Sequence, residues 1–145
     1  MTSAVPILRT AKLTTLSAEQ AVANWNAIEP LLSKSLPYAL GRVSMEDVKD
    51  VVAKEMGMIV IGWDPTTSEV YVAFFCEIQT YKTGRKCFHI SLAGGREIGE
   101  WDHLWPVLKK IGKDQDCDHI EISGRPGWGR VLGLREVSRM YVEDL

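Results

Sequence analysis

The sequence has few of the features that mark membrane proteins and nucleic-acid-binding proteins. It contains no apolar run near the about 18 residues that a membrane-spanning helix needs. The N-terminus lacks the charged-then-apolar pattern of a signal peptide. Basic residues form no block, and the formal net charge is −2. We therefore expect no membrane segment and no nucleic acid as the primary partner.

Cysteine is also scarce. The three thiols, Cys76, Cys87 and Cys117, are odd in number and lack the spacing of zinc ligands. His103 and His119 are too scattered along the chain to complete a metal site, so we predict no metal. Cysteines in this pattern are typical of reduced, mostly buried thiols in a cytosol.

The composition is otherwise that of an ordinary globular chain, with 46% hydrophobic and 25% charged residues. A chain of 145 residues predicts one domain over residues 1–145, with a core that needs no disulfide. Five tryptophans is a high number for this length, and tryptophan is common at binding surfaces. We expect some of them to contact a partner.

The densest group of unusual residues follows a short β-type run that ends at residue 123. It consists of Gly124, Arg125, Pro126, Gly127, Trp128, Gly129 and Arg130. Gly124 can end a strand with positive φ, and Pro126 suits the first turn of a helix. The stretch therefore predicts a strand-to-helix junction.

Two interpretations of this junction stay open. Arg125 and Arg130 carry planar guanidinium groups that suit carboxylate or phosphate, and Trp128 offers a large amphipathic face. In the first interpretation they form a cleft that binds an anion or a protein partner. In the second, the junction is a tight turn with a packed tryptophan and two structural arginines.

Hydrophobic periodicity predicts the order of the elements. Helices are predicted at 18–33, 44–57, about 101–111 and 126–132, and strands at 58–63, 69–80, 85–92, 119–123 and 137–142, with a short edge strand at 5–8. Residues 37–38 read as a loop. Pro30 and Pro106 lie within helical patterns, which predicts a break in the first helix and a kink in the third.

This order predicts an α/β fold, in the mixed α+β sense. Short turns join the strands at 58–63, 69–80 and 85–92, so they should form an antiparallel meander. A helix-containing crossover leads to the strand at 119–123, which should therefore lie parallel to the third strand. We expect five or six strands in one mixed sheet with helices on both faces.

With this element order the chain resembles the GNAT N-acetyltransferase family over nearly its whole length. It looks most like the small GNAT-like proteins of tailed bacteriophages. The residues that carry the resemblance are 92–95, Trp101 in the next helix, and Ile120 and Glu121 before the 124–132 stretch. The resemblance implies a GNAT-like sheet and a cleft where that sheet splays near residue 124.

Active members of the family bind acyl-coenzyme A (acyl-CoA) through a loop whose bare amides face the pyrophosphate. The family pattern is Gln or Arg, two residues, Gly, one residue, and then Gly or Ala. Arg96 and Gly99 match its first and fourth positions, and Gly94 and Gly95 precede them. The resemblance therefore makes these four residues the candidates for binding acetyl-CoA. An ordinary loop at the start of a helix would show the same residues.

Three residues in the same loop disagree with phosphate binding. Trp101 occupies the last position of the pattern, where a small residue is expected, and Glu97 and Glu100 add negative charge. We therefore predict that acetyl-CoA binds weakly or not at all.

The resemblance also suggests where acid and base chemistry would lie. Active members commonly carry a tyrosine acid in the helix after the splayed strand, but residues 126–132 contain none. Tyr141, in the predicted last strand, is poorly placed to replace it. Glu77 is the best candidate for the general base and His89 the second, although strand glutamates are more often simply solvated.

Two functions are therefore compatible with the sequence. The first, which we favour at this stage, is a GNAT-fold binding or assembly module of a bacteriophage that has lost acyl transfer or retains little of it. Its partners would be phage structural proteins, and it would be located in the host cytoplasm or the virion. The second is an active acetyl-CoA-dependent N-acetyltransferase with a divergent pyrophosphate loop.

Overall fold

A computed structural model describes residues 12–95, 102–123 and 126–145 of the chain. The elements in chain order are β1 (Lys12–Leu16), α1 (Ala18–Ala23), α2 (Trp25–Leu32), the 3-10 helix η2 (Ser33–Ala39), α3 (Met45–Ala53), β2 (Met58–Trp63), β3 (Val70–Thr80), β4 (Lys86–Gly95), the 3-10 turn η3 (Asp102–Leu104), α5 (Trp105–Asp114), β5 (His119–Ile122) and α6 (Pro126–Leu132). No helix within these ranges has the length and apolar character needed to cross a bilayer.

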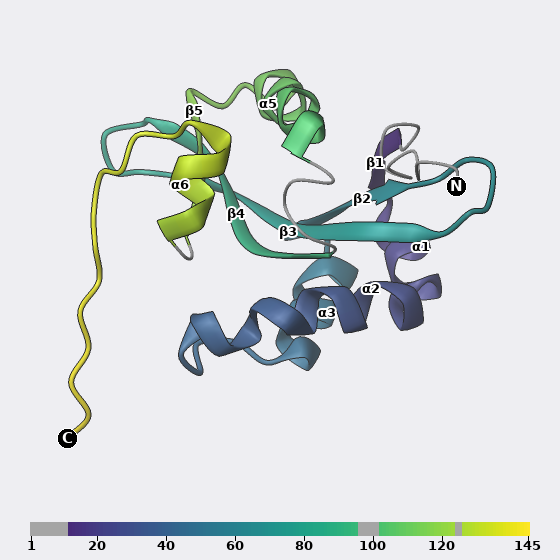
Figure 1. The fold of residues 1–145 in the computed structure, drawn as a ribbon, viewed down its shortest axis with the longest axis horizontal. Helices are drawn as coiled ribbons and strands as arrows, with labels where there is room; N and C mark the ends of the chain where they lie inside the picture. The colour runs from purple at the N-terminus through teal and green to yellow at the C-terminus, as the bar shows by residue number, and fades with distance from the viewer. Residues whose placement is uncertain (1–11, 96–101, 124–125) are drawn as a thin grey trace, which may run out of the picture.

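The strands of the described residues form one mixed sheet in the order β1-β2-β3-β4-β5 (Figure 1). The pairs from β1 to β4 are antiparallel, which confirms the predicted meander. β5 lies parallel to β4, with Ile122 opposite Ile90. The predicted α/β fold with a crossover to a parallel strand is therefore confirmed.

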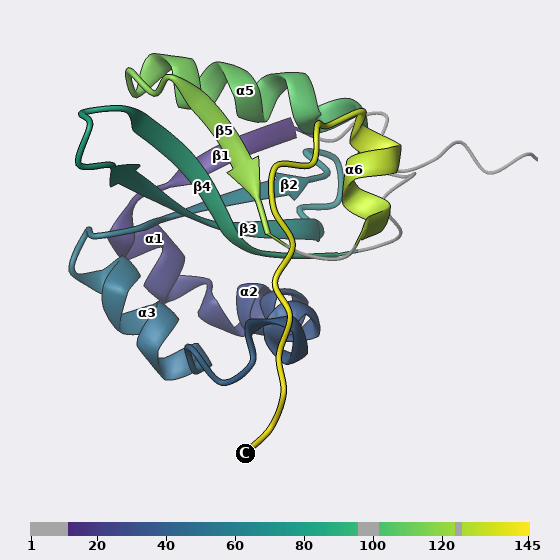
Figure 2. The ribbon, with the colours of Figure 1, turned by 90° about the vertical axis from the view of Figure 1, so that its left-hand side faces the viewer.

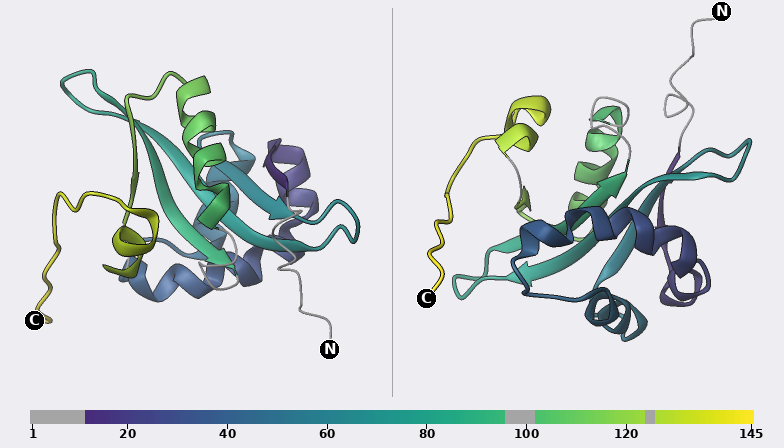
Figure 3. Two further views of the ribbon diagram at one scale, coloured as in Figure 1. Left: turned by 45° about the horizontal axis from the view of Figure 1, so that its top comes forward. Right: turned by 60° about the horizontal axis from the view of Figure 1, so that its bottom comes forward.

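Each face of the sheet has its own apolar core under its own helices. Phe75 and Leu92 point into the core that includes residues of α1, α2 and α3. Phe74 and Ile90 point into the opposite core, which includes Leu108 of α5. Figure 2 shows α5 on one side of the sheet and α1–α3 on the other, and Figure 3 shows α5 across one face and α2 across the other. Helices cover both faces, as the sequence predicts.

The first helical region is divided at a different residue from the one predicted. α1 ends at Ala23, and the side-chain Nδ2 of its C-cap residue, Asn24, donates to the Gln20 carbonyl oxygen at 2.7 Å. Pro30 lies inside α2, and the helix continues past it to Leu32. The predicted break at Pro30 is wrong, and the cause of the division is the local bonding of Asn24.

Three further helix predictions need correction. Residues 37–38 belong to η2 and are not a loop. α3 ends at Ala53, before Glu55 adopts a φ of 60°, whereas the predicted helix continued to residue 57, and Met56 in that stretch is 71% exposed. Pro106 lies in the first turn of α5, where a proline costs no hydrogen bond, so it does not kink the helix.

The two ends of the chain differ from expectation. β1 was not predicted, because residues 12–16 have only a weak pattern; it becomes a strand by pairing with β2. The predicted strand at 5–8 lies outside the described residues. The predicted strand at 137–142 is wrong, since residues 133–145 are neither helix nor strand and extend away from the sheet (Figure 1). Alternating apolar residues produce a strand only where a sheet edge pairs with them.

Candidate functional site

A cluster of polar side chains lies on one face of the β4–β5 pair. Its members are Tyr81, Cys87, His89, His119 and Glu121, and we call it the Glu121 cluster. In the parallel register Cys87 pairs with His119, and His89 pairs with Glu121. Because side chains alternate along a strand, these four strand residues share one face of the sheet.

The alternation along β4 identifies that face. Phe88 and Ile90 are fully buried in the core that contains Leu108 of α5. Cys87 and His89 alternate with them and therefore point to the opposite face, which carries α1–α3. The side chain of His89 is 16% exposed, so the cluster is shielded from water but still accessible.

Glu121 is the centre of the cluster. Its Oε2 accepts a hydrogen bond from the Tyr81 hydroxyl at 2.7 Å and lies 3.1 Å from His119 Nε2. Its Oε1 lies 2.7 Å from His89 Nδ1. Burial raises the pKa of Glu121, but hydrogen bonds from Tyr81, His119 and His89 outweigh burial and lower that pKa to about 2. Glu121 is therefore an anion at neutral pH and is a poor proton acceptor.

The pKa values of two neighbours of Glu121, Tyr81 and Cys87, are raised. The hydrogen bond to Glu121 raises the pKa of the Tyr81 hydroxyl, since an ionised phenol beside a carboxylate would be repelled. Burial raises the pKa of the Cys87 thiol to about 11. A thiol that stays protonated is a weak nucleophile, so Cys87 does not qualify as the attacking group of a covalent mechanism.

The hydrogen bonds assign a tautomer to each histidine. Arg85 Nε donates to His119 Nδ1 at 3.0 Å, so His119 carries its proton on Nε2 and donates it to Glu121. The ionised Glu121 can only accept, so His89 donates from Nδ1. His89 Nε2 is then the basic nitrogen, and no hydrogen bond within the described ranges occupies it. This is the arrangement of a histidine base oriented by a carboxylate.

Glu77, the other predicted base, lies on β3, the strand that flanks β4 on the side away from β5. It pairs with His89 across β3 and β4, so Glu77, His89 and Glu121 form a row across three strands. Glu77 Oε1 accepts a hydrogen bond from Ser91 Oγ at 2.7 Å. The two predicted bases thus lie side by side, and the structure adds Glu121 as the partner of the second.

Sequence reasoning assigned no role to Glu121, although the signal was present. His119 and Glu121 are two residues apart in a predicted strand, and so are Cys87 and His89 in another. Strand alternation puts each pair on one face. Only the register, which the sequence does not reveal, shows that the two faces coincide.

The cluster lies just before β4 and β5 separate. Their pairing ends at Ile90 and Ile122, whereas β4 continues to Gly95. Within the described residues no strand pairs with that edge of β4 beyond Ile90. His89 is therefore one residue from the part of β4 that pairs with β3 alone among the described strands.

The glycines predicted to bind cofactor have clear packing roles. A Cβ on Gly94 would collide with the backbone carbonyl of Leu31, because α2 packs directly on β4 there. A Cβ on Gly95 would collide with the Tyr71 carbonyl, and its own carbonyl accepts from Lys34 Nζ at 3.3 Å. Contact with a cofactor stays a prediction for both. Arg96 and Gly99 lie outside the described residues, as do Trp101, Glu97 and Glu100.

The junction residues fall into different environments. Trp128 is partly buried and packs with Leu132 and Leu134 against the core under α5, so it helps to hold α6 on the sheet. Arg130 is exposed on α6. Arg125 lies outside the described residues. The role of these residues in a cleft or partner surface stays a prediction.

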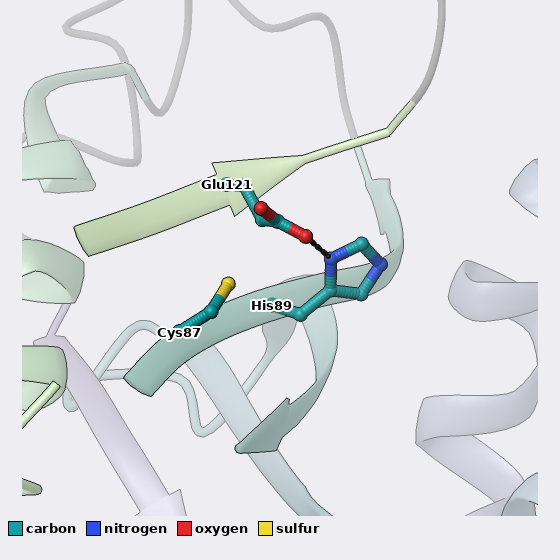
Figure 4. Close-up of side chains that lie close together, drawn as sticks. All are labelled: Cys87, His89 and Glu121. Carbon is teal, nitrogen blue, oxygen red and sulfur yellow. Dashed lines mark hydrogen bonds and ion pairs between the residues drawn. The ribbon is translucent and has the colours of Figure 1, made fainter. Parts of the chain in front are cut away.

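The cluster also brings together possible metal ligands. One ligand atom from each of Cys87, His89 and Glu121 lies within 4.8 Å of the others. Figure 4 shows the sulfur and the imidazole of β4 on the same side as the carboxylate of β5. The sequence predicted no metal, because the three cysteines lack the spacing of zinc ligands and His103 and His119 are scattered along the chain. The β4–β5 register brings Cys87, His89 and Glu121 together in space, although Glu121 is 32 residues from His89 along the chain.

Two surface hollows lie away from the cluster. One of about 340 Å³ is lined by Leu16, Val52 and Met58 among others, and one of about 280 Å³ by Thr14, Ile61 and Trp63 among others. Neither includes a member of the Glu121 cluster. The chemistry of the side chains, and not the depth of a hollow, therefore identifies the candidate site.

Comparison of the sequence finds no matching family model and no sufficiently similar curated protein. Comparison of the structure finds many acetyltransferases. An aminoglycoside acetyltransferase from an uncultured soil metagenomic sample, in complex with sisomicin, matches with a TM-score of 0.69 and 8% identity, covering 96% of this chain and 99% of the other. This chain has the GNAT fold.

Two more acetyltransferases show the same likeness. Glucosamine-6-phosphate N-acetyltransferase from Arabidopsis thaliana matches with a TM-score of 0.61 and 15% identity over 93% of this chain and 98% of the other. An aminoglycoside N-acetyltransferase in complex with CoA matches with a TM-score of 0.62 and 13% identity over 93% and 94%. At these identities the likeness establishes the fold alone.

Proposed function

We propose that this chain is an acyl-CoA-dependent N-acyltransferase in which His89 is the general base. One observation carries the proposal: the Nδ1 of His89 lies 2.7 Å from the ionised Glu121, and its side chain is only 16% exposed. A histidine that only faces solvent from a strand would not require a carboxylate partner at its Nδ1. On this observation we propose the second of the two functions that the sequence left open.

In acyl transfer the acceptor amine must lose a proton as its nitrogen attacks the thioester carbonyl carbon. His89 Nε2 takes that proton, and Glu121 stabilises the imidazolium that forms, since its carboxylate faces Nδ1. The new C–N bond forms, the C–S bond breaks, and the electron pair of that bond leaves on sulfur. Glu121 itself stays ionised throughout, because its pKa of about 2 is far below neutral pH.

The open edge of β4 suits the thioester substrate. Beyond Ile90, β4 pairs with β3 on one edge, and no strand pairs with its other edge within the described residues. The pantetheine arm of CoA contains amides that can pair with such an edge as an added strand does. An arm bound there would hold its thioester next to His89.

Two features predict that transfer is slow. α6 contains no tyrosine, so this helix offers no phenol to protonate the departing thiolate. The sequence also places Trp101, Glu97 and Glu100 where phosphates would bind. We therefore expect weak acetyl-CoA binding together with His89-dependent turnover.

The second candidate is a binding or assembly module without acyl transfer. Its support is the C-terminal segment, in which Val137 is 76% exposed, Met140 68% and Tyr141 84%. Exposed apolar side chains of this kind suit contact with a protein partner. A phage structural protein as that partner, and a location in the virion or host cytoplasm, are proposals that rest on the family resemblance.

The test measures acetyl-CoA binding by calorimetry and CoA release with a panel of amines. His89→Gln should lower the turnover of bound substrates by about 100- to 10,000-fold while leaving acetyl-CoA affinity within about threefold. His103→Gln, which changes a histidine of η3 outside the cluster, is the matched control and should keep wild-type turnover. Equal turnover in wild type and His89→Gln would contradict the proposal. The absence of acetyl-CoA binding and turnover would favour the binding module.

A further inference from the structure

We propose that Cys87, His89 and Glu121 form a three-ligand site for a thiophilic divalent cation such as Zn²⁺. The ligand atoms are Cys87 Sγ, His89 Nδ1 and Glu121 Oε1 (Figure 4). Sulfur, imidazole nitrogen and carboxylate oxygen are the donor types that Zn²⁺ prefers. The site goes beyond acyl transfer and does not depend on it.

The geometry is close to what a tetrahedral ion requires. The ligand atoms of the three residues lie within 4.8 Å of one another. In a tetrahedral Zn²⁺ site the sulfur and nitrogen ligands lie roughly 3.5 Å apart, from bond lengths of about 2.3 and about 2.0 Å. Small rotations of the side chains would close the site, without a change in the backbone.

The β4–β5 register explains why the three ligands meet. Cys87 and His89 are two residues apart on one face of β4, and Glu121 is the cross-strand partner of His89. Cys87 is fully buried, and the side chain of Glu121 is 33% exposed. Ligands carried by paired strands are held in place before the ion arrives, which lowers the entropy lost on binding.

The surrounding residues hold the carboxylate in a suitable orientation. Tyr81 and His119 both bond to Oε2 of Glu121, which leaves Oε1 for the cation. His119 is not a ligand in this arrangement, because Arg85 occupies its Nδ1 and its Nε2 carries the proton. Such supporting hydrogen bonds orient ligands and raise metal affinity.

Charge also fits a divalent ion. Binding of the cation would displace the proton of the Cys87 thiol, and the resulting thiolate and the Glu121 carboxylate together carry two negative charges, which balance Zn²⁺ in a partly buried place. Three protein ligands leave a fourth position for water. A cation here would replace the proton between His89 Nδ1 and Glu121 Oε1. If the proposed function holds, the cation would remove the oriented base and inhibit transfer reversibly.

The experiment uses the full chain after removal of metal with a chelator. Titration with Co²⁺ should give one bound ion per chain with a thiolate-to-cobalt charge-transfer band, and Zn²⁺ should displace it. Cys87→Ser should abolish the band and weaken Zn²⁺ binding by at least about tenfold. Cys117→Ser, which changes a partly exposed thiol outside the cluster, should leave both unchanged. His119→Gln should keep the stoichiometry and weaken binding by about 10- to 100-fold.

Three results would overturn the site. They are Co²⁺ binding without a thiolate band in the wild type, no binding of Co²⁺ or Zn²⁺, and a band that survives Cys87→Ser but disappears in Cys117→Ser. If Cys87→Ser fails to fold by circular dichroism, His89→Gln provides the second variant, and it should weaken Zn²⁺ binding while keeping the fold. Unchanged Zn²⁺ affinity in a folded His89→Gln would also count against the proposal. Metal binding is measured without substrate. The metal site can therefore be disproved while the proposed acyl transfer is confirmed, and acyl transfer can be disproved while the metal site is confirmed.

Discussion

The two faces of β4 between Cys87 and Ile90 have opposite characters. On the α5 side Phe88 and Ile90 have no exposed surface and belong to a continuous apolar core. On the other side His89 points into a network of hydrogen bonds that is centred on Glu121. Packing on the first face holds the strand still, and this rigidity gives the second face fixed distances between its polar groups. Stability and chemistry are thus separated by a single residue step along the strand.

The largest expected effect tests that separation directly. Phe88→Ala should lower the free energy of unfolding by about 3–5 kcal/mol, because it leaves a cavity in a fully buried core. His89→Gln, one residue away, should lower it by no more than about 1 kcal/mol, since the side chain is polar and partly exposed. Urea denaturation of both variants at neutral pH measures the difference. Equal losses of unfolding free energy in the two variants would show that both faces contribute alike to stability.

A second pair of variants tests the far end of β4. Gly94→Ala should cost about 1–3 kcal/mol, because its new methyl group would collide with the Leu31 backbone and push α2 from the sheet. Gly129→Ala is the matched control, since the nearest atom to a Cβ there is the Leu134 carbonyl oxygen at an ordinary 3.7 Å. The control lies within α6 and should be neutral or stabilising by up to about 1 kcal/mol. A thermal unfolding series compares them, and a neutral Gly94→Ala would contradict the close packing.

The smallest expected effect concerns the pH dependence of the polar face. The pKa of Glu121 is lowered from 4.5 to about 2 in the folded chain, so its stabilising contribution is present above the unfolded pKa. That contribution is lost as the pH falls from about 4.5 towards 2. After allowance for screening by solvent, we expect it to be on the order of 1 kcal/mol.

Glu121→Gln should therefore be less stable than the wild type at pH 7, and the difference should shrink between pH 4.5 and 2. Urea denaturation at several pH values measures this. The Phe88→Ala deficit provides the control, because a cavity has no reason to titrate in this range. A constant difference between wild type and Glu121→Gln would mean that the carboxylate is not held by charge-assisted hydrogen bonds.

Most of the sheet could be predicted because its strands have strong local patterns. The strand at Met58–Trp63 was predicted with the same ends, and the three central strands were placed as the meander that the structure shows. The helices predicted from residues 18 and 44 likewise start within one residue of α1 and α3, whose N-caps are Ser17 and Ser44. Failures came where the outcome depends on a distant partner. β1 exists because β2 pairs with it, and residues 137–142 have no such edge.

The candidate site was predictable only in part, for the same reason. His89 and Glu77 were chosen from their positions in strands, and the structure places them next to each other. The partner that makes His89 a base, Glu121, is 32 residues away along the chain. No local sequence pattern predicts a contact between residues that far apart in the chain.

The sequence by itself determined the α/β class, the strand order of the meander, the parallel crossover and the alternation that puts Cys87 with His89 on one face. These follow from hydrophobic period and short turns, which act within a few residues. Only the tertiary structure decided that this face meets the face of His119 and Glu121. The register of two parallel strands depends on how the α5 crossover that connects them packs against the sheet, and packing is a property of the whole fold.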